Sequence, residues 1–198
     1  STRTRKRRER GLSAITWCIK ANTSGFELDH HNVFFARDYA REFTAIFNDR
    51  SVCNEPTVYV CAQDRVNGEL SIDDKERLLL LINAPADGDH GAWTHSKLEQ
   101  QRQNALKVLS RGGLKLDFTE EDCVTTCPDN WHQRFPGSAG SLYGAASHGI
   151  FSSFSRPSST SRVKGLYLAG GSAHPGPGVP MATLSGSIAA RRIQHDAA

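Results

Sequence analysis

Residues 166–186 read LYLAGGSAHPGPGVPMATLSG and decide the C-terminal architecture of the chain. The apolar start predicts a short strand over residues 165–171, and the Gly/Pro-rich centre predicts a loop. Pro180 suits the first position of a helix, because its missing N–H would have no acceptor there. Apolar residues at helical spacing continue to about Ile193. The stretch therefore predicts a strand, a glycine loop and a helix N-terminus in succession.

This loop has the composition of a binding site. A helix N-terminus presents unpaired N–H groups and the positive end of the helix dipole to an anion or a polarised carbonyl. A side chain at Gly170 or Gly171 would keep a cofactor away from the backbone. The same residues also suit a plain tight connection between strand and helix. The dinucleotide fingerprint G-x-G-x-x-G/A is not met, because Met181 occupies the last position after Gly176 and Gly178.

Upstream of this stretch, strands alternate with helices. A helix should begin after the N-cap Asp38, and a second should occupy residues 93–110. The first helix has an apolar stripe that we expect to face a core: Tyr39, Phe43, Ile46 and Phe47. Strands are expected over residues 12–21, 33–35, 57–62 and 76–84.

Two segments lie between these elements and the C-terminal stretch. Residues 64–75 read as a charged hairpin loop, and the leucine run that follows predicts a strand buried on both faces. Pro128 predicts the start of a short helix. Residues 136–162 are rich in Gly, Ser and Pro, and so long an irregular segment is either disordered or functional.

Composition narrows the function classes. The chain has 198 residues and a formal net charge of +3, of which the first ten residues carry +5 and the rest −2. We expect this basic arm to be a solvated linker or a contact with an anionic membrane surface, and no nucleic-acid partner. No apolar run is long enough for a transmembrane span. The start without Met or a leader segment suggests that residue 1 lies within a longer protein.

Several segments together resemble one family. Residues 166–186 closely resemble the C-terminal signature of the bacterial carotenoid desaturases, flavoproteins similar to phytoene desaturase. FPGSAGSLYGAASHG at residues 135–149 resembles the glycine-rich stretch of that family. TWCIKANTSGF, HNVFFARDY and PTVYVCAQDR resemble its middle region. The forms GGS…HPGPGVPMA and TVYVCAQDR are most similar to the branch of 1-hydroxycarotenoid 3,4-desaturases, also called methoxyneurosporene dehydrogenases.

The resemblance implies the C-terminal part of an FAD enzyme, without its N-terminal nucleotide-binding half. The implied fold class is α/β: an α+β substrate part with an antiparallel or mixed sheet, and a return to a Rossmann-like FAD domain. Residues 1–134 would bind substrate, residues 135–164 would connect, and residues 165–198 would form the strand, loop and helix of the FAD domain. The isolated fragment would be inactive.

The resemblance also implies which residues line the FAD. Flavin amine oxidases place a carboxylate after the Ala-Gly pair of the strand, where this chain has Gly171, so the ribityl contacts stay unassigned. The implied cofactor-binding residues are Gly170, Gly171, Ser172, His174, Gly176, Gly178, Val179, Pro180 and Met181.

The implied reaction removes a hydride and a proton from a C–C bond of an acyclic carotenoid bearing a 1-hydroxy or 1-methoxy group, with FAD as hydride acceptor. The lipophilic substrate implies peripheral contact with the cytoplasmic side of the cell or intracytoplasmic membrane. Two alternatives stay open. One is a phytoene or other carotene desaturase, and the other is a non-catalytic fragment that binds lipid or a membrane surface.

Single polar residues add little certainty about chemistry. His174 lies in the glycine loop and is a weak catalytic candidate, as proton acceptor or flavin-orienting group, or else a structural loop histidine. His148 could face the same site. Neither residue is assigned a catalytic role from sequence.

Cysteines offer one weak metal motif. Cys123 and Cys127 are spaced C-x₃-C with His132 nearby, but no second pair at ligand spacing accompanies them, so no metal site is expected. The other cysteines are expected to be core or surface thiols: Cys18, Cys53 and Cys61.

Overall fold

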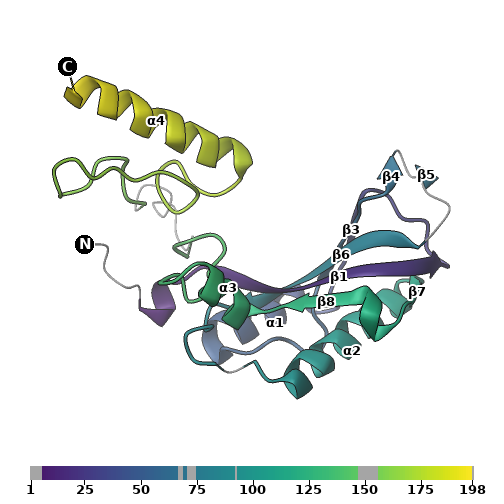
Figure 1. The fold of residues 1–198 in the computed structure, drawn as a ribbon. Coiled ribbons are helices and arrows are strands. Elements are labelled where there is room, and N and C mark those ends of the chain that lie inside the picture. The colour runs from purple at the N-terminus through teal and green to yellow at the C-terminus, as the bar shows by residue number, and fades with distance from the viewer. Residues whose placement is uncertain (1–5, 67–68, 71–74, 92, 147–155, 198) are drawn as a thin grey trace. The chain divides into compact units, whose positions relative to one another are not determined.

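The computed structural model describes residues 6–66, 69–70, 75–91, 93–146 and 156–197 (Figure 1). The chain divides into two compact units. One is Ser13–Gly140, and the other joins Ser1–Leu12 to Ser141–Ala198. A curled sheet with helices makes up the first unit, which confirms the predicted α/β class.

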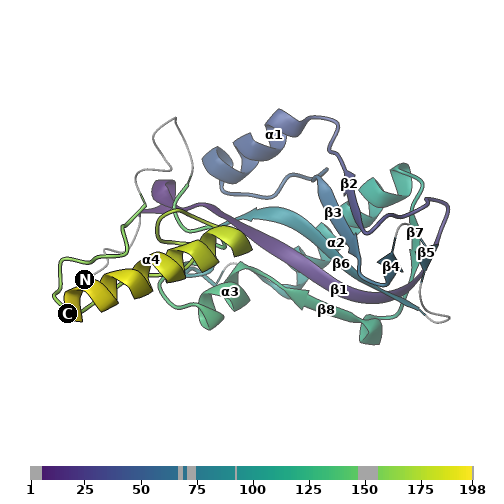
Figure 2. The same cartoon turned by 90° about the horizontal axis from the view of Figure 1, so that it is seen from above.

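The sheet has the strand order β2-β3-β6-β1-β7, with β8 also paired to β1. The pairs β2–β3, β3–β6, β1–β7 and β1–β8 are antiparallel. Figure 2 shows β8 beside β1. The strands are β1 (Leu12–Ser24), β2 (His31–Phe34), β3 (Val58–Ala62), β6 (Glu76–Pro85), β7 (Lys115–Asp117) and β8 (Cys123–Thr126).

The four strands expected from sequence are confirmed, with shifts of a few residues at their ends. Strands β7 and β8 are not predicted from the sequence, because both are short and partly polar. These two segments become strands because β1 offers them its unpaired N–H and C=O groups. Thr16 to Ile19 of β1 pair with β8, and Asn22 to Ser24 pair with β7.

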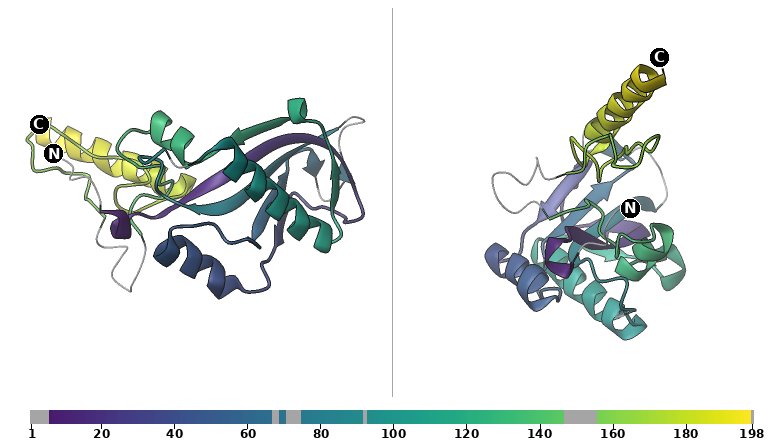
Figure 3. Two further views of the ribbon diagram at one scale, coloured as in Figure 1. Left: turned by 90° about the horizontal axis from the view of Figure 1, so that it is seen from below. Right: turned by 90° about the vertical axis from the view of Figure 1, so that its left-hand side faces the viewer.

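The core of this unit lies between the sheet and helix α2 (His95–Arg111). The left view of Figure 3 shows this helix, in teal, lying along the sheet. Trp17 and Ile15 of β1 are almost fully buried there. The leucine run of β6 is buried on one face only, since Leu79 and Leu81 keep partial exposure, so the prediction of two buried faces is wrong. Further core side chains are Leu78, Leu80, Ile82, Ala105, Val108 and Leu109.

Helix α1 (Tyr39–Thr44) continues into a π-helical turn, Ala45–Asp49. Asp38 is its N-cap as predicted, because its Oδ1 accepts a hydrogen bond from Arg41 N at 2.9 Å. The predicted buried stripe is wrong in part. Ile46 is buried, but Tyr39 is 50% exposed, and Glu42 takes the buried side.

Glu42 explains this rotation of the helix. Its carboxylate accepts hydrogen bonds from Thr57 N at 3.0 Å and from Asn83 Nδ2 at 3.2 Å. A buried carboxylate needs such partners, so the helix turns this side chain toward β3 and β6. The aromatic residues of the stripe then form a ring-to-ring ladder along a partly exposed side: Phe35, Tyr39, Phe43 and Phe47.

The remaining elements of this unit are short. The hairpin predicted within residues 64–75 is present as β4 (Arg65–Val66) and β5 (Glu69–Leu70). A 3₁₀ turn, Glu120–Asp122, precedes β8. Helix α3 (Pro128–Arg134) begins at Pro128 as predicted.

The second unit contains a 3₁₀ turn (Arg7–Glu9), loops and helix α4 (Val179–Ala197). The helix is confirmed, but the predicted strand over residues 165–171 is wrong. A strand needs a partner along its length. In the described part of this segment, backbone pairing with a neighbouring segment consists of the Thr160–Tyr167 bridge and its two hydrogen bonds, Leu168 N to Ser159 O and Ser161 N to Leu166 O.

The described part of the basic arm is built into this unit. Gly11 N donates to Gly144 O at 2.9 Å, and Ala146 N donates to Glu9 O at 3.0 Å. Arg10 is buried, whereas Lys6 and Arg7 are exposed. The arm from residue 6 onward is therefore not a free solvated linker. None of the helices in the described ranges is both long and apolar enough to cross a membrane.

Candidate functional site

The glycine loop of the second unit runs from residue 170 into α4. Gly170 and Gly178 have φ values of +109° and +100°, which side-chain-bearing residues rarely adopt. A Cβ built on either residue would meet no heavy atom within 4 Å. Glycine is therefore required here by backbone conformation, and the backbone is open on the side where a side chain would stand. Gly171 has no such φ, and its Cβ would make ordinary contact with Pro177.

Arg156 fixes the backbone of this loop through hydrogen bonds. Its side chain is buried, and its Nη1 donates to Gly171 O at 2.9 Å while Nη2 donates to Tyr143 O at 3.0 Å. A Cβ on Gly176 would lie 3.3 Å from Arg156 Nε, and one on Gly144 would lie 3.2 Å from Nη1. The guanidinium thus joins the glycine loop to the segment after Ser141.

Ser185 fastens the loop to α4. It is completely buried, and its Oγ accepts a hydrogen bond from Gly170 N at 3.2 Å. The segment after Arg156 runs along the other side of the loop, because His174 N donates to Pro157 O at 2.8 Å. Figure 1 shows this loop beside the helix. The loop is therefore held in one shape by side chains outside it.

The first turn of α4 is open. Ala182 N makes a helical hydrogen bond to Gly178 O, so the N–H groups before it have no acceptor within the helix. Val179 is 82% exposed and Met181 is 44% exposed. This end of the helix offers N–H donors, a positive dipole end and apolar side chains together.

The residues predicted to line a cofactor form one continuous stretch of this loop and helix turn. Ser172 and His174 are exposed, whereas Gly176 is buried against Arg156. His148 lies outside the described residues. Arg156 and Ser185 are not among the residues predicted from the sequence. Arg156 did leave a signal, since no other Lys, Arg, Asp or Glu occurs between residues 135 and 161.

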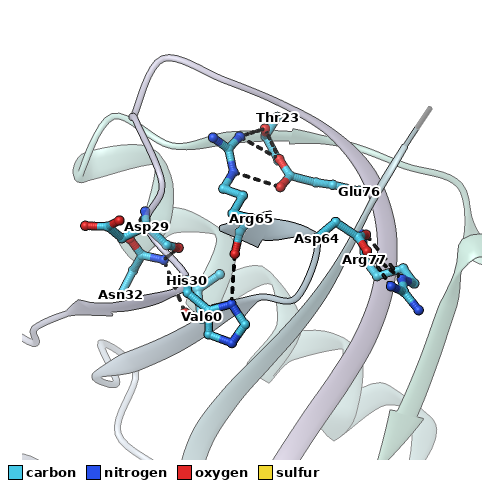
Figure 4. A network of polar contacts seen from close by, with 9 residues as sticks. All are labelled: Thr23, Asp29, His30, Asn32, Val60, Asp64, Arg65, Glu76 and Arg77. Atoms are coloured by element: carbon cyan, nitrogen blue, oxygen red, sulfur yellow. Dashed lines mark hydrogen bonds and ion pairs between the residues drawn. The ribbon is translucent and has the colours of Figure 1, made fainter. Parts of the chain in front are cut away.

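The first unit contains a separate network of buried charges at the β4 end of the sheet (Figure 4). Glu76 is 2% exposed and accepts hydrogen bonds from Arg65 Nε at 2.9 Å and from its Nη2 at 3.0 Å. Thr23 Oγ1 also donates to Glu76. These hydrogen bonds to Glu76 raise the pKa of Arg65 above its usual value. The segment read as a charged loop thus contributes Arg65 to an ion pair whose carboxylate, on Glu76, is buried.

Asp64 belongs to the same region. Its carboxylate is buried and accepts hydrogen bonds from Arg77 Nε at 2.9 Å and from Arg77 N at 2.7 Å. The side-chain hydrogen bond from Arg77 is the main cause that lowers the pKa of Asp64 below its usual value. With each of these acids paired to a cation, the network is suited to stabilise the sheet rather than to exchange protons.

The cysteine motif noted in the sequence is not a ligand cluster in the described residues. Cys123 lies on β8, and Cys127 caps α3, where its N–H donates to Asn130 Oδ1 at 2.9 Å. Burial raises the pKa of the Cys127 thiol. His132 does not join these two in a group of three ligand atoms within the described ranges. The five cysteines are free thiols.

Comparison with known proteins identifies the family. The family described as flavin containing amine oxidoreductase matches residues 34–194, most of the chain. The chain belongs to this family. The chain is similar to hydroxyneurosporene desaturases from Rubrivivax gelatinosus, 52% identical over 93% of this chain, and Cereibacter sphaeroides, 41% identical over 96%. A 1-hydroxycarotenoid 3,4-desaturase from Flavobacterium is 33% identical over 96% of the chain.

The matches cover only part of those relatives. The chain spans 35% of the Rubrivivax protein, 37% of the Cereibacter protein and 39% of the Flavobacterium protein. A phytoene desaturase from Fusarium fujikuroi is more distant, at 26% identity over 96% of this chain.

The glycine loop fits the cofactor that defines this family. A flavin needs close approach to the backbone, N–H donors for its ring edge or phosphates, and apolar contacts for its ring faces. Gly170 and Gly178 leave the backbone uncovered, and the exposed start of α4 supplies the donors and the apolar contacts. No carboxylate directly follows the Ala169-Gly170 pair, so the loop offers backbone groups at this point.

Proposed function

We propose that the chain is part of an FAD-dependent carotenoid desaturase, an oxidoreductase that acts on CH–CH groups. The substrate class is an acyclic carotenoid with a 1-hydroxy or 1-methoxy group. The support is the identity to relatives that are named hydroxyneurosporene desaturase and 1-hydroxycarotenoid 3,4-desaturase. The open backbone of Gly170 and Gly178 at the head of α4 is the structural observation that carries the proposal.

In the proposed enzyme, residues 165–198 belong to the FAD-binding domain, residues 135–164 connect, and residues 1–134 bind substrate. Bound FAD supplies the hydride acceptor. The loop lines the cofactor through Gly170, Gly171, Ser172, His174, Gly176, Gly178, Val179, Pro180 and Met181.

The chain's own contribution is mainly position and exclusion of water. Arg156 and Ser185 hold the loop backbone in one shape, so its open face is preorganised for the cofactor. Val179 and Met181 present apolar side chains at the start of α4, where they would shield reacting carbons from water. An extended polyene delocalises developing positive charge without help from the protein.

His174 is the proposed candidate for the proton. Loss of a hydride and a proton from adjacent carbons leaves a new double bond, and the proton needs an acceptor. The His174 side chain is exposed on the loop, and its backbone is held by Pro157 O. His174→Gln should then lower turnover while flavin content stays unchanged. Full turnover in this variant would leave His174 a structural residue.

The activity test uses the purified protein that contains these 198 residues, with FAD and a 1-hydroxycarotenoid. The expected result is a red shift of carotenoid absorbance and a product two hydrogens lighter by mass spectrometry. Phytoene and other carotenes, tested in parallel, separate the proposal from the alternative desaturases, since preferential consumption of one of them would favour that alternative. No desaturation of any carotenoid would refute the enzyme class and leave a lipid-binding role.

We also propose peripheral contact with the cytoplasmic side of the cell membrane or intracytoplasmic membrane, from which a carotenoid would enter. The support is the partly exposed aromatic ladder of the first unit. Phe35 is 61% exposed beside Tyr39, and the exposed cations Arg37 and Arg41 flank them, each also in an exposed ion pair with a carboxylate. Aromatic rings next to basic side chains suit an anionic lipid surface.

Liposome flotation tests this contact. The double variant Phe35→Ser/Tyr39→Ser should reduce binding to anionic vesicles, because it removes exposed aromatic area. Val124→Ser, a change at a 64% exposed residue of β8, is the matched control. Equal flotation of both variants and the unchanged protein would contradict a role for the ladder.

A further inference from the structure

Three potential metal ligands converge at the β2–β3 edge of the sheet, remote in sequence from the glycine loop. His31 and Cys61 are directly opposite each other in the antiparallel pair β2–β3. Opposite residues in such a pair project from the same face. His30 precedes β2, and its carbonyl accepts a hydrogen bond from Ala62 N at 2.9 Å, which holds it beside Cys61.

The distances suit a first-row metal ion. Cys61 Sγ lies 3.8 Å from His30 Nε2, and one ligand atom from each of the three residues lies within 4.8 Å of the others. Tetrahedral zinc with ordinary Zn–S and Zn–N bonds separates its ligand atoms by about 3.3–3.7 Å. The His30–Cys61 spacing is close to that range, and a small rotation of the exposed His31 ring closes the rest.

Outer hydrogen bonds orient both imidazoles. His30 Nδ1 lies 3.0 Å from Arg65 O, a carbonyl that can only accept, so Nδ1 carries the proton and the Nε2 lone pair is free (Figure 4). His31 Nδ1 lies 2.8 Å from Tyr59 Oη. A second hydrogen bond that fixes the ring and its tautomer is the usual support of a metal-ligating histidine.

We propose that His30, His31 and Cys61 form a binding site for a zinc-class divalent ion, with water in the fourth position. Two imidazoles and a thiolate are borderline-soft ligands that favour zinc over magnesium or calcium. Binding requires the thiolate, so the Cys61 thiol loses its proton to solvent as the Sγ–metal bond forms. The ion would link the residue before β2 to the end of β3.

Tyr59 supports this arrangement from the same strand as Cys61. The Tyr59 hydroxyl is the hydrogen-bond partner of the His31 ring. The site uses no residue of the glycine loop.

The test is calorimetric titration of the purified protein, flavin retained, with ZnCl₂. One ion should bind per chain, and titration in buffers of different ionisation enthalpy should report release of about one proton. With CoCl₂ in place of zinc, a thiolate-to-cobalt absorption band should form. Cys61→Ser should remove that band and weaken zinc binding by about tenfold or more. His30→Gln and His31→Gln should weaken zinc binding similarly.

The matched controls are Cys18→Ser and His95→Gln, which change an exposed thiol and an exposed imidazole elsewhere in the same unit. Both should bind zinc like the unchanged protein. Because Cys61 is buried, circular dichroism of the metal-free variants checks the fold, and the exposed His31 carries the test if Cys61→Ser does not fold. Substoichiometric zinc binding, or unchanged binding in His31→Gln, would overturn the proposal.

Discussion

The buried guanidinium of Arg156 donates a hydrogen bond to the carbonyl oxygen of Gly171 at 2.9 Å. With its other terminal nitrogen it reaches Tyr143 O, so one side chain connects two loops that are far apart in the chain. The carbonyl of Gly171 is thereby turned toward the cation.

Arg156→Lys should therefore weaken flavin binding without abolishing the fold. A single ammonium cannot reproduce the planar fork that meets both carbonyls. Loss of one hydrogen bond to a charged group amounts to about 1.5–3 kcal/mol, or roughly tenfold or more in affinity. The measurement is the amount of flavin bound per protein, from absorbance after purification. Arg162→Lys, at an exposed position, is the control, and equal loss in both variants would contradict the role of Arg156.

Two glycine variants compare a positive-φ position in the loop with a helical position in α4. Gly170→Ala forces a side chain into φ +109°, at a cost of about 1–3 kcal/mol, and places a methyl group on the open face of the loop. Gly186→Ala, inside α4 with nothing within 4 Å of its Cβ, should stabilise the helix by up to about 1 kcal/mol. The midpoint temperature of thermal unfolding and the flavin content should both fall only in Gly170→Ala. Unchanged flavin content in that variant would argue against the loop as the cofactor site.

Glu76→Gln should destabilise the sheet unit. The amide keeps the shape and one acceptor but leaves the largely buried Arg65 without its counter-ion, at about 2–3 kcal/mol in the free energy of unfolding. Glu69→Gln on the exposed strand β5 is the matched control and should change little. Denaturant unfolding of both variants measures the difference. Equal stability would mean that the Arg65–Glu76 pair contributes nothing net.

The free energy of unfolding should also fall in acid, because Asp64 then loses its charge. Arg77 lowers the folded-state pKa of Asp64, so the contribution is complete above the unfolded value of about 3.9 and is lost as pH falls through the lower folded value. The stability difference between the unchanged protein and Asp64→Asn should therefore narrow below about pH 4. Asp117→Asn, at an exposed position of the same unit, is the matched control variant. A constant difference from pH 7 to pH 3 would contradict this cause.

Local chemistry made several parts of the fold predictable. Asp38 is an N-cap because its side chain can accept from a nearby backbone N–H, and this depends only on adjacent residues. Pro180 marks the start of α4 for a similarly local reason. The glycine loop could be located because only glycine tolerates the φ of Gly170 and Gly178.

The predictions that proved wrong concern features that are set by contacts between residues far apart in the sequence. Glu42 faces inward on α1 because its carboxylate accepts hydrogen bonds from Thr57 N and the Asn83 side chain, and neither residue is adjacent to it in sequence. The strand expected before the loop is absent because only one bridge, to Thr160, pairs with it in the described part of that segment. Periodicity cannot report whether a partner strand is present.

By itself, the sequence determined the family resemblance, the four longer strands and the helices of the first unit, and the place of the glycine loop, because these depend on residue type and local spacing. Tertiary structure alone decided that Arg156 reaches Gly171 and that His30, His31 and Cys61 meet at one edge. Strand register and loop closure set those distances, and both depend on contacts between residues far apart in the chain.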